Sequence, residues 1–183
     1  MFTFKTKQKV YDFAGIKVGG QPGENPPLMI TSMFHNKDKI VQDRKGNFDR
    51  QRAKEIIRKQ EEMTDVTGIP SMVAMVANSP DEAKTYIDFF LETTAMPFGI
   101  DMWVAEQRTK ATEYVAKIGA QDKFLYNSIT PWDKDIKGQV QKLKDLGIRH
   151  VVIQAFDDQD QTPQGRVKSL ESILAQGADS FDT

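Results

Sequence analysis

The chain has 183 residues, no cysteine and a formal net charge of -1, and 39% of its residues are hydrophobic. The lack of cysteine excludes zinc–thiolate sites, thiol nucleophiles and iron–sulfur ligation within this sequence, and the near-neutral charge argues against nucleic acid as a main partner. No apolar run approaches the roughly 20 residues of a membrane helix, and the first residues lack the apolar stretch of a secretion signal. We therefore expect a cytoplasmic globular protein without membrane insertion.

The first predicted element is a β-hairpin. Ala14-Gly15 is a turn signal between two short strands at 9–13 and 16–18. The Gly- and Pro-rich segment 19–27 continues neither a strand nor a helix. Residues 1–27 are therefore interpreted as an N-terminal hairpin and loop.

Strands and helices then alternate five times over residues 28–177. The predicted strands are the short apolar runs at 28–33, 71–77, 98–102, 124–129 and 150–156. The predicted helices lie at 49–63, from 79 onward, at 104–118, at 130–147 and at 165–176. Each unit has about 30 residues, the usual size of a βα repeat, and the alternation is typical of a parallel sheet. No linker divides the chain, so the sequence predicts a single α/β domain over 1–183.

Two helix starts share one capping pattern. Ser79 can cap a helix, with Pro80 at the first helical position and Glu82 completing a capping box. Thr130-Pro131-Trp132-Asp133 repeats this pattern and predicts a second helix start at Thr130.

The glycine pattern favours a barrel over a dinucleotide-binding fold. The turn after the strand at 28–33 reads Phe-His-Asn-Lys-Asp rather than Gly-x-Gly-x-x-Gly, and residues 19–23 lack the Lys-Ser/Thr pair of a phosphate loop. The leading fold is therefore a TIM-barrel-type arrangement of (βα) repeats. A complete (βα)₈ barrel typically takes about 250 residues, so this chain corresponds to about five of eight units.

Polar residues follow the predicted strands at their C-terminal ends, where barrels and open parallel sheets bind ligands. These residues are His35, Asn78, Asp101, Asn127 and Gln154. A carboxylate and several amides would suit a flat heterocycle with an amide-like edge. Asp101 stands out because a charge within a strand is costly unless it is paired or faces the mouth. Asn127 is in a similar position, whereas Asn78 can simply shape a turn and His35 can be a surface histidine.

Other features point to chemistry carried by a bound cofactor. The acidic segment 157–160 is interpreted as a solvated loop, and with two histidines and no cysteine the sequence predicts no metal site. Trp103 and Trp132 adjoin strand ends, where each could wall a ligand pocket or pack between helices. Neither a Gly-x-Ser-x-Gly elbow nor a His-Glu-x-x-His pair is present, which favours cofactor chemistry over a side-chain nucleophile.

Five segments of the sequence resemble a known methyltransferase family. Residues 14–24, Ala-Gly-Ile-Lys-Val-Gly-Gly-Gln-Pro-Gly-Glu, are similar to the opening of the MtrH subunit of tetrahydromethanopterin S-methyltransferase. The segments 39–41, 64–70, 97–101 and 126–129 resemble later parts of that family in the same order and spacing. Bacterial relatives of the family are corrinoid-dependent enzymes that pass a methyl group to tetrahydrofolate.

The resemblance implies a pterin-binding barrel of the dihydropteroate synthase-like group. In that group an Asp at the end of strand three and an Asn at the end of strand four hold the pterin, and Asp101 and Asn127 occupy those positions. The family pattern Ile-Asp-x-x-x-x-Glu-x-Arg retains Glu106 and Arg108, but the segment 102–105, Met-Trp-Val-Ala, departs from the usual small polar residues. A further pterin-holding acid normally comes from strand six, which lies beyond the end of this sequence.

The resemblance also implies a role in one-carbon metabolism. Asp101 would fix the aminopyrimidine edge of tetrahydrofolate or tetrahydromethanopterin and Asn127 would orient its ring, with Asn78 and Gln154 as further contacts. Cobalamin would arrive on a separate corrinoid protein, and the chain is expected to form a homodimer. The alternative is a non-catalytic fragment or assembly subunit, because five parallel units leave an open sheet edge that can pair with another chain.

Overall fold

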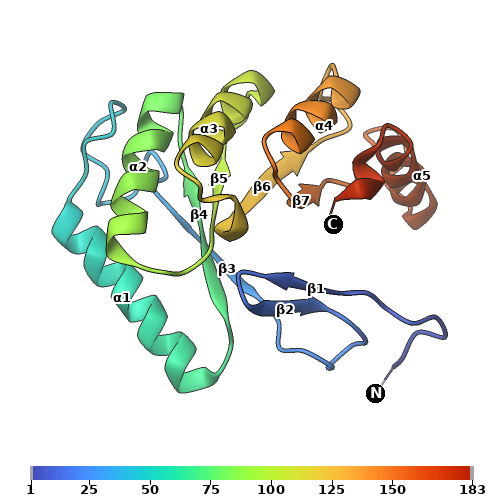
Figure 1. The fold of residues 1–183 in the computed structure, drawn as a ribbon, viewed down its shortest axis with the longest axis horizontal. Helices are drawn as coiled ribbons and strands as arrows, with labels where there is room; N and C mark the ends of the chain where they lie inside the picture. The colour runs from blue at the N-terminus through green and yellow to red at the C-terminus, as the bar shows by residue number, and fades with distance from the viewer. Residues whose placement is uncertain (1, 182–183) are drawn as a thin grey trace. The chain divides into compact units, whose positions relative to one another are not determined.

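A computed structural model of the chain describes residues 2–181. An antiparallel hairpin pairs β1 (Val10–Phe13) with β2 (Ile16–Gly19), as the sequence predicts. The second sheet has the strand order β3-β4-β5-β6-β7 (Figure 1). Its members are β3 (Met29–Met33), β4 (Ser71–Val76), β5 (Phe98–Asp101), β6 (Phe124–Ile129) and β7 (His150–Ile153).

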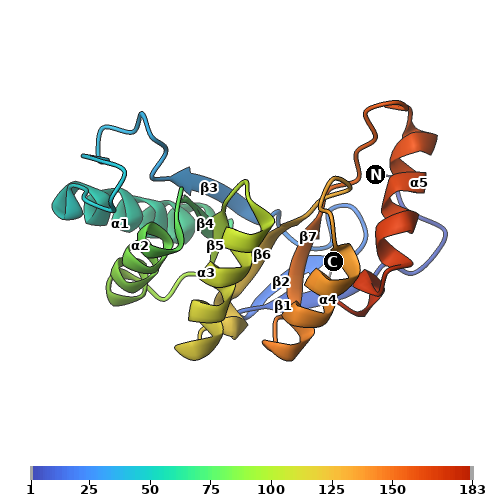
Figure 2. The same ribbon diagram turned by 90° about the horizontal axis from the view of Figure 1, so that it is seen from above.

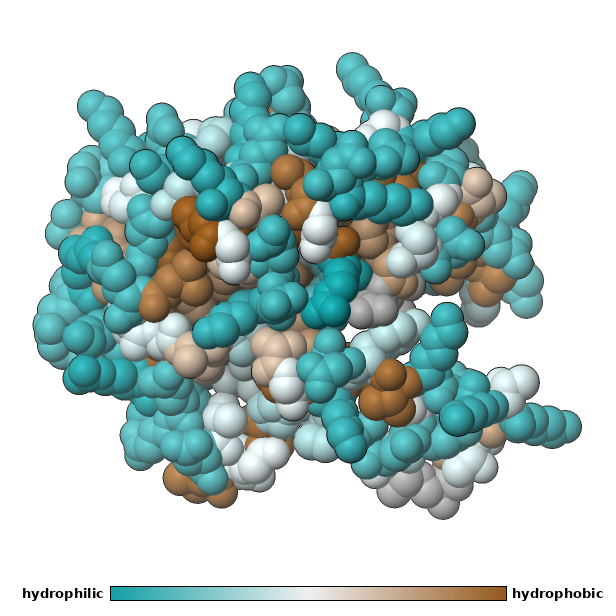
Figure 3. All heavy atoms as spheres, in the orientation of Figure 1, coloured by the Kyte–Doolittle hydropathy of each residue, from teal (hydrophilic) through white to brown (hydrophobic). Residues whose placement is uncertain are grey.

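A helix follows each strand of the second sheet. The helices are α1 (Arg50–Thr67), α2 (Pro80–Thr93), α3 (Ala105–Lys117), α4 (Ile136–Asp145) and α5 (Pro163–Leu174). Short 3₁₀ turns occupy Gln121–Lys123 and Ala178–Ser180. The helix surfaces seen in the orientation of Figure 1 are mostly hydrophilic (Figure 3). Among the described helices, none has the length and apolar character needed to cross a membrane.

This arrangement confirms the α/β class and agrees with part of an α/β barrel. β3 pairs with β4, and β6 with β7, in parallel, and sequential parallel strands joined through helices are the pattern of βα repeats. The chain divides into two compact units, residues 1–99 and 100–183. A single barrel domain over the whole chain stays a prediction.

In the first unit, aromatic side chains and the β4 strand form the core. Five consecutive residues of β4 from Ser71 are buried, as expected for a strand covered on both faces. Phe34 stacks on Tyr86 of α2 with ring centroids 4.1 Å apart, and Phe48 packs edge-on against both rings. The predicted Ser79 cap is present, since its Oγ accepts a hydrogen bond from the Glu82 backbone N–H at 3.2 Å.

Tyr86 makes the first unit sensitive to alkaline pH. Its side chain is buried, and burial, reinforced by the Glu82 and Asp43 carboxylates, raises the pKa of Tyr86 to about 12. In the unfolded chain the Tyr86 phenol loses its proton near pH 10. The contribution of the protonated Tyr86 to stability is therefore fully present below pH 10 and is lost as the pH rises towards 12. We expect the free energy of unfolding to fall by about 1.4 kcal/mol per pH unit in that window.

The measurement is urea unfolding at a series of pH values from 9 upward, compared with the Tyr86→Phe variant. Phenylalanine keeps the stacked ring but cannot ionise, so its unfolding free energy should lose this part of the alkaline slope. Equal slopes for the two proteins would contradict the assignment.

In the second unit, two element boundaries differ from the sequence-based expectation. The helix predicted to begin at Thr130 begins at Ile136, where Asp135 caps it by accepting from the Gly138 N–H at 2.8 Å. The Thr130 hydroxyl is buried and makes no hydrogen bond within the described residues, and the backbone N–H of Thr130 donates to Asp133 instead. The local Thr-Pro-Trp-Asp pattern therefore forms a turn rather than a helix start.

The strand predicted at 150–156 ends at Ile153. Ile129 of β6 pairs with Ile153, and beyond this point only the Gln154 N–H continues the ladder, by donating to the Ile129 carbonyl at 2.9 Å. The next backbone bond, from Phe156 to the Gln154 carbonyl, closes a tight turn. The polar residues after Ile153 are thus held in a loop at the end of the strand.

Candidate functional site

Three of the predicted site residues lie in the second unit at or near the C-terminal ends of strands. Asp101 is the last residue of β5 and is exposed, Asn127 is the fourth residue of β6 and is half-buried, and Gln154 directly follows β7 and is exposed. Across residues 2–181, no hydrogen bond engages these three side chains. Their polar atoms are therefore available to a ligand.

The pleat of β6 fixes the direction of Asn127. The preceding residue, Tyr126, is buried, and its hydroxyl accepts hydrogen bonds from Arg108 of α3 and Gln139 of α4. Both helices therefore cover the same face of β6 (Figure 2). Since successive strand residues point to opposite faces, Asn127 points away from these helices.

β7 pairs with β6 at the position of Asn127. Val152 pairs with Asn127, and Gln154 follows two residues later. A register shift lies directly after Asn127, because Ser128 has no partner between the pairs made by Asn127 and Ile129; the peptide bond between Asn127 and Ser128 is cis. A register shift of this kind turns side chains to directions that a regular ladder does not give them. Val152 thus shares the face of Asn127, and Gln154 lies in the loop that follows β7.

Arg108 forms the centre of a buried polar network on the side of β6 that α3 and α4 cover. Its Nη1 donates to the Met102 carbonyl at 2.7 Å, its Nε to the Tyr126 hydroxyl at 3.1 Å, and its Nη2 to Asp133 at 3.1 and 3.3 Å. The side chains of Arg108 and Asp133 are only 4% and 7% exposed. A buried charge pair of this kind is tolerable because each member has hydrogen-bonding partners.

The two remaining strand-end candidates lie in the first unit. The Asn78 amide donates to the Asn36 side-chain oxygen at 3.0 Å and to the buried Glu82 carboxylate at 2.9 Å, and its oxygen accepts from Asn36 at 3.4 Å. His35 is exposed, and its Nε2 lies 2.8 Å from the Ser32 hydroxyl. Asn78 therefore shapes the entrance to α2 in this conformation, and its contact with a pterin stays a prediction.

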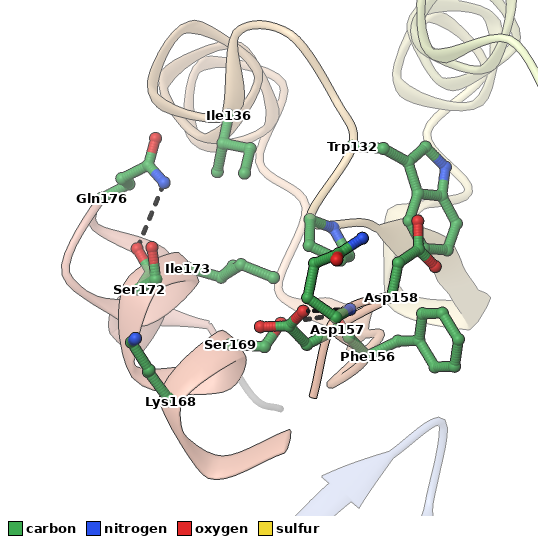
Figure 4. A pocket seen from close by; sticks show the side chains of 12 residues that line it. Trp132, Ile136, Phe156, Asp157, Asp158, Lys168, Ser169, Ser172, Ile173 and Gln176 are labelled. Atoms are coloured by element: carbon green, nitrogen blue, oxygen red, sulfur yellow. Dashed lines mark hydrogen bonds between the residues drawn. The ribbon is translucent and has the colours of Figure 1, made fainter. Parts of the chain in front are cut away.

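A cavity of about 440 Å³ in the second unit lies between α5, the start of α4 and the loop after β7. Trp132 and Phe156 meet edge to face on one side of it, and Lys168 and Ser172 line the α5 side (Figure 4). Asp157 accepts hydrogen bonds from the backbone of its own loop, as in the predicted solvated loop. The four predicted pterin contacts are not among the lining residues.

The two tryptophans have different environments. Trp132 lines this cavity and also a groove of about 720 Å³ between α3 and α4. Trp103 also lines the groove between α3 and α4 and is 91% exposed, so it does not pack between helices. In the part of the chain that the structure describes, no group of three or more His, Cys, Asp or Glu side chains could hold a metal ion; the expectation that the chain binds no metal stays a prediction.

Comparison with known proteins identifies the family. The family model for the tetrahydromethanopterin S-methyltransferase MtrH subunit matches residues 6–180. The chain belongs to this family. It is 34% identical over its whole length to the MtrH protein of tetrahydromethanopterin S-methyltransferase from Methanothermobacter marburgensis, covering 57% of that protein. It is also 38% identical over 94% of its length to a Methanosarcina acetivorans protein named as the H subunit of the mtx methyltransferase, covering 55% of it.

The chain thus spans about half the length of the curated MtrH relatives it matches.

Within the Ile-Asp-x-x-x-x-Glu-x-Arg pattern, the two retained residues differ in environment. Glu106 is exposed, and its hydrogen bond with Lys110 at 2.7 Å lowers the pKa of its carboxyl group. Arg108 is buried. Glu106 therefore belongs to an exposed ion pair with Lys110, and Arg108 to a buried ion pair with Asp133. The buried pair bonds to β6 and to the backbone directly after β5 and β6.

The sequence patterns did not indicate Tyr126, Asp133 or Gln139. Tyr126 and Asp133 accept hydrogen bonds from the Arg108 side chain, and Gln139 donates to the Tyr126 hydroxyl. One signal could have revealed Arg108 itself as inward-facing. It precedes Ala111, Thr112 and Val115 at spacings of three, four and seven residues, and all four are buried on one face of α3. Its partners lie in other elements, at spacings that follow no local rule.

Proposed function

We propose that this chain binds a tetrahydropterin through Asp101 and Asn127 and moves a methyl group between that pterin and a protein-bound methylcorrinoid. The observation that carries the proposal is a pair of polar side chains without hydrogen bonds among the described residues, one at the end of β5 and one in the C-terminal half of β6, in an MtrH-family chain. A relative named for tetrahydromethanopterin S-methyltransferase supports tetrahydromethanopterin as the pterin, with tetrahydrofolate as the alternative.

The chemistry of the free groups fits a reduced pterin. An aminopyrimidine edge offers parallel N–H donors, and a carboxylate such as Asp101 accepts two of them with charge-assisted strength. The Asn127 amide can both donate and accept, so it can orient the ring beside that edge. Gln154 directly follows β7 and can add a further contact.

Methyl transfer of this kind is a displacement, so the residues of this chain contribute alignment and electrostatics rather than a covalent bond. The corrinoid supplies a methyl group bound to cobalt when its carrier is docked. Asp101 would hold the pterin so that its reacting nitrogen is directed at the incoming group, and Asn127 would stabilise the change of charge near that nitrogen. No side-chain nucleophile is needed.

Partner proteins follow from the same proposal, because the relatives are named as subunits. Trp103 and Val104, which are 91% and 51% exposed, follow Asp101 closely in the sequence. Exposed tryptophan is typical of the residues that anchor protein interfaces. We place the corrinoid protein on this surface, beside the pterin. The homodimer expected from the sequence stays a prediction.

The test measures methyl transfer to each tetrahydropterin from two donors, free methylcobalamin and the methylated corrinoid protein. The change in corrinoid absorbance reports the rate of transfer. We expect one of the two pterins to support transfer. Trp103→Ala should lower the rate from the protein-bound donor by about tenfold, the cost of losing an interface anchor, without changing the rate from free methylcobalamin. Val167→Ala, at a 54% exposed position of α5, is the surface control. Equal loss with both donors would contradict docking at Trp103.

A second candidate function, assembly with a chain that adds a strand to β3, is favoured by one observation. β3 is at the end of the strand order, and beside it an apolar groove of about 480 Å³ includes the partly exposed Met29, Ile56 and Met63. An open strand edge is a template for pairing with another chain. Transfer from neither donor would favour this function over the first.

A further inference from the structure

The Arg108 side chain bonds both to the segment directly after β5 and to the β6 residue that precedes Asn127. We propose that Arg108 is a positioning residue that sets the geometry of Asp101 and Asn127 without touching the pterin. This inference rests on the proposed function of those two residues. It concerns a group that the methyl transfer itself does not use.

The first link runs to Asp101. Arg108 Nη1 donates to the carbonyl of Met102 at 2.7 Å and lies 3.4 Å from that of Trp103, and the Arg108 backbone N–H donates to the Val104 carbonyl at 3.0 Å. The Met102 side chain is itself buried. The segment directly after Asp101 is thus held at both its backbone and its side chain, which restricts the orientation of the carboxylate.

The second link runs to Asn127. Arg108 Nε donates to the Tyr126 hydroxyl at 3.1 Å, and the guanidinium carbon lies 5.5 Å from the centre of the Tyr126 ring. Tyr126 has no exposed surface, and Gln139 holds the same hydroxyl from α4. Asn127 is the next residue along the strand, so its side chain points to the opposite face. Holding Tyr126 on the helix-covered face therefore also restricts the direction of the Asn127 side chain.

The third link explains why this residue is an arginine. Asp133 accepts two hydrogen bonds from Nη2 and one from the Thr130 N–H at 2.9 Å, so the guanidinium plane is anchored to the turn after β6. A planar fork reaches a carbonyl, a hydroxyl and a carboxylate in fixed directions at once, whereas a lysine ammonium is a single point on a flexible stem. Lysine would keep the charge but lose the fixed geometry.

The experiment uses Arg108→Lys and Tyr126→Phe, with Arg149→Lys as control, because Arg149 forms an exposed ion pair with Asp122. Tetrahydropterin binding is measured by calorimetry at a temperature where circular dichroism shows every variant folded. We expect Arg108→Lys to raise the dissociation constant about tenfold and Tyr126→Phe to raise it several-fold. The double variant should cost less than the product of the two, since both break one network. Arg149→Lys should match the wild type.

A spectroscopic readout separates positioning from a purely structural role. The side-chain amide of Asn127 is followed by nitrogen-15 NMR without ligand, and Arg108→Lys should shift it more than the amide of Asn25 in the N-terminal loop. The positioning role is overturned if Asp101→Ala weakens binding but folded Arg108→Lys binds with unchanged affinity and leaves the Asn127 signal unmoved. If Asp101→Ala binds as tightly as the wild type, the proposed function fails, and the inference fails with it.

Discussion

Replacing Asp101 with alanine is expected to weaken tetrahydropterin binding about 100-fold and to leave the stability of the chain unchanged. A hydrogen bond to a charged group contributes about 1.5–3 kcal/mol, and the Asp101 carboxylate can accept two. A loss of about 2.8 kcal/mol corresponds to a hundredfold change in the dissociation constant. Calorimetric titration with tetrahydromethanopterin and with tetrahydrofolate measures this loss directly.

The expected lack of a folding effect follows from the free state of the side chain. Asp101 is exposed, and its carboxylate has no hydrogen bond within residues 2–181. Substitution of such a surface group usually changes stability by no more than about 0.5 kcal/mol. Thermal unfolding of the Asp101→Ala variant should therefore match the wild type. Equal stability ensures that a change in titration reports the site and not the fold.

Two matched variants sharpen the result. Asp101→Asn keeps the shape and one acceptor oxygen, so its affinity should lie between those of the wild type and the alanine variant. Asp122→Ala removes another exposed carboxylate of the same unit, whose side chain is 86% exposed and pairs with Arg149, and it should bind normally. If Asp122→Ala weakened binding as much as Asp101→Ala, the effect would be one of general charge and the assignment of Asp101 would be wrong.

The elements of the fold could be predicted largely because their signals are local. The strand expected at 124–129 is β6 without change, since an apolar run between turn residues identifies it. The Ser79 cap also formed as its spacing indicates. The matching pattern at Thr130 failed for a tertiary reason: the Asp133 carboxylate, which would have served a helix start, binds the buried Arg108. A local capping rule is overridden where a buried cation requires a partner.

The candidate site also combines residues that local sequence patterns indicate with residues that only tertiary contacts bring together. Asp101 and Asn127 could be predicted as candidates from the sequence because ligand-binding residues of parallel sheets occur near strand ends, and their role as pterin contacts stays a prediction. The hydrogen-bond network around Arg108 could not be predicted, because Arg108, Tyr126 and Asp133 belong to α3, β6 and the turn after β6. Only the folded chain brings these three together. The sequence thus predicts candidate residues at strand ends, whereas the contacts around Arg108 depend on the tertiary structure.

Replacing Asp133 with asparagine is expected to cost about 3–5 kcal/mol of unfolding free energy. The substitution leaves the Arg108 guanidinium buried without its counter-charge, and an uncompensated buried charge costs that much. It also weakens the acceptor for the Thr130 N–H at the end of β6. The loss is a large share of the roughly 5–15 kcal/mol that stabilises a typical domain.

Urea unfolding followed by tryptophan fluorescence measures this loss where it occurs, because both tryptophans of the chain, Trp103 and Trp132, lie in the second unit. The control is Asp122→Asn, which breaks the exposed pair with Arg149 and should cost at most about 1 kcal/mol. Adding Arg108→Met to Asp133→Asn removes the unpaired charge and should recover part of the stability, but not all, because the Met102 carbonyl and the Tyr126 hydroxyl then lose their donor. A double variant less stable than Asp133→Asn alone would show that the hydrogen bonds of Arg108, rather than its charge pair, hold this part of the fold together.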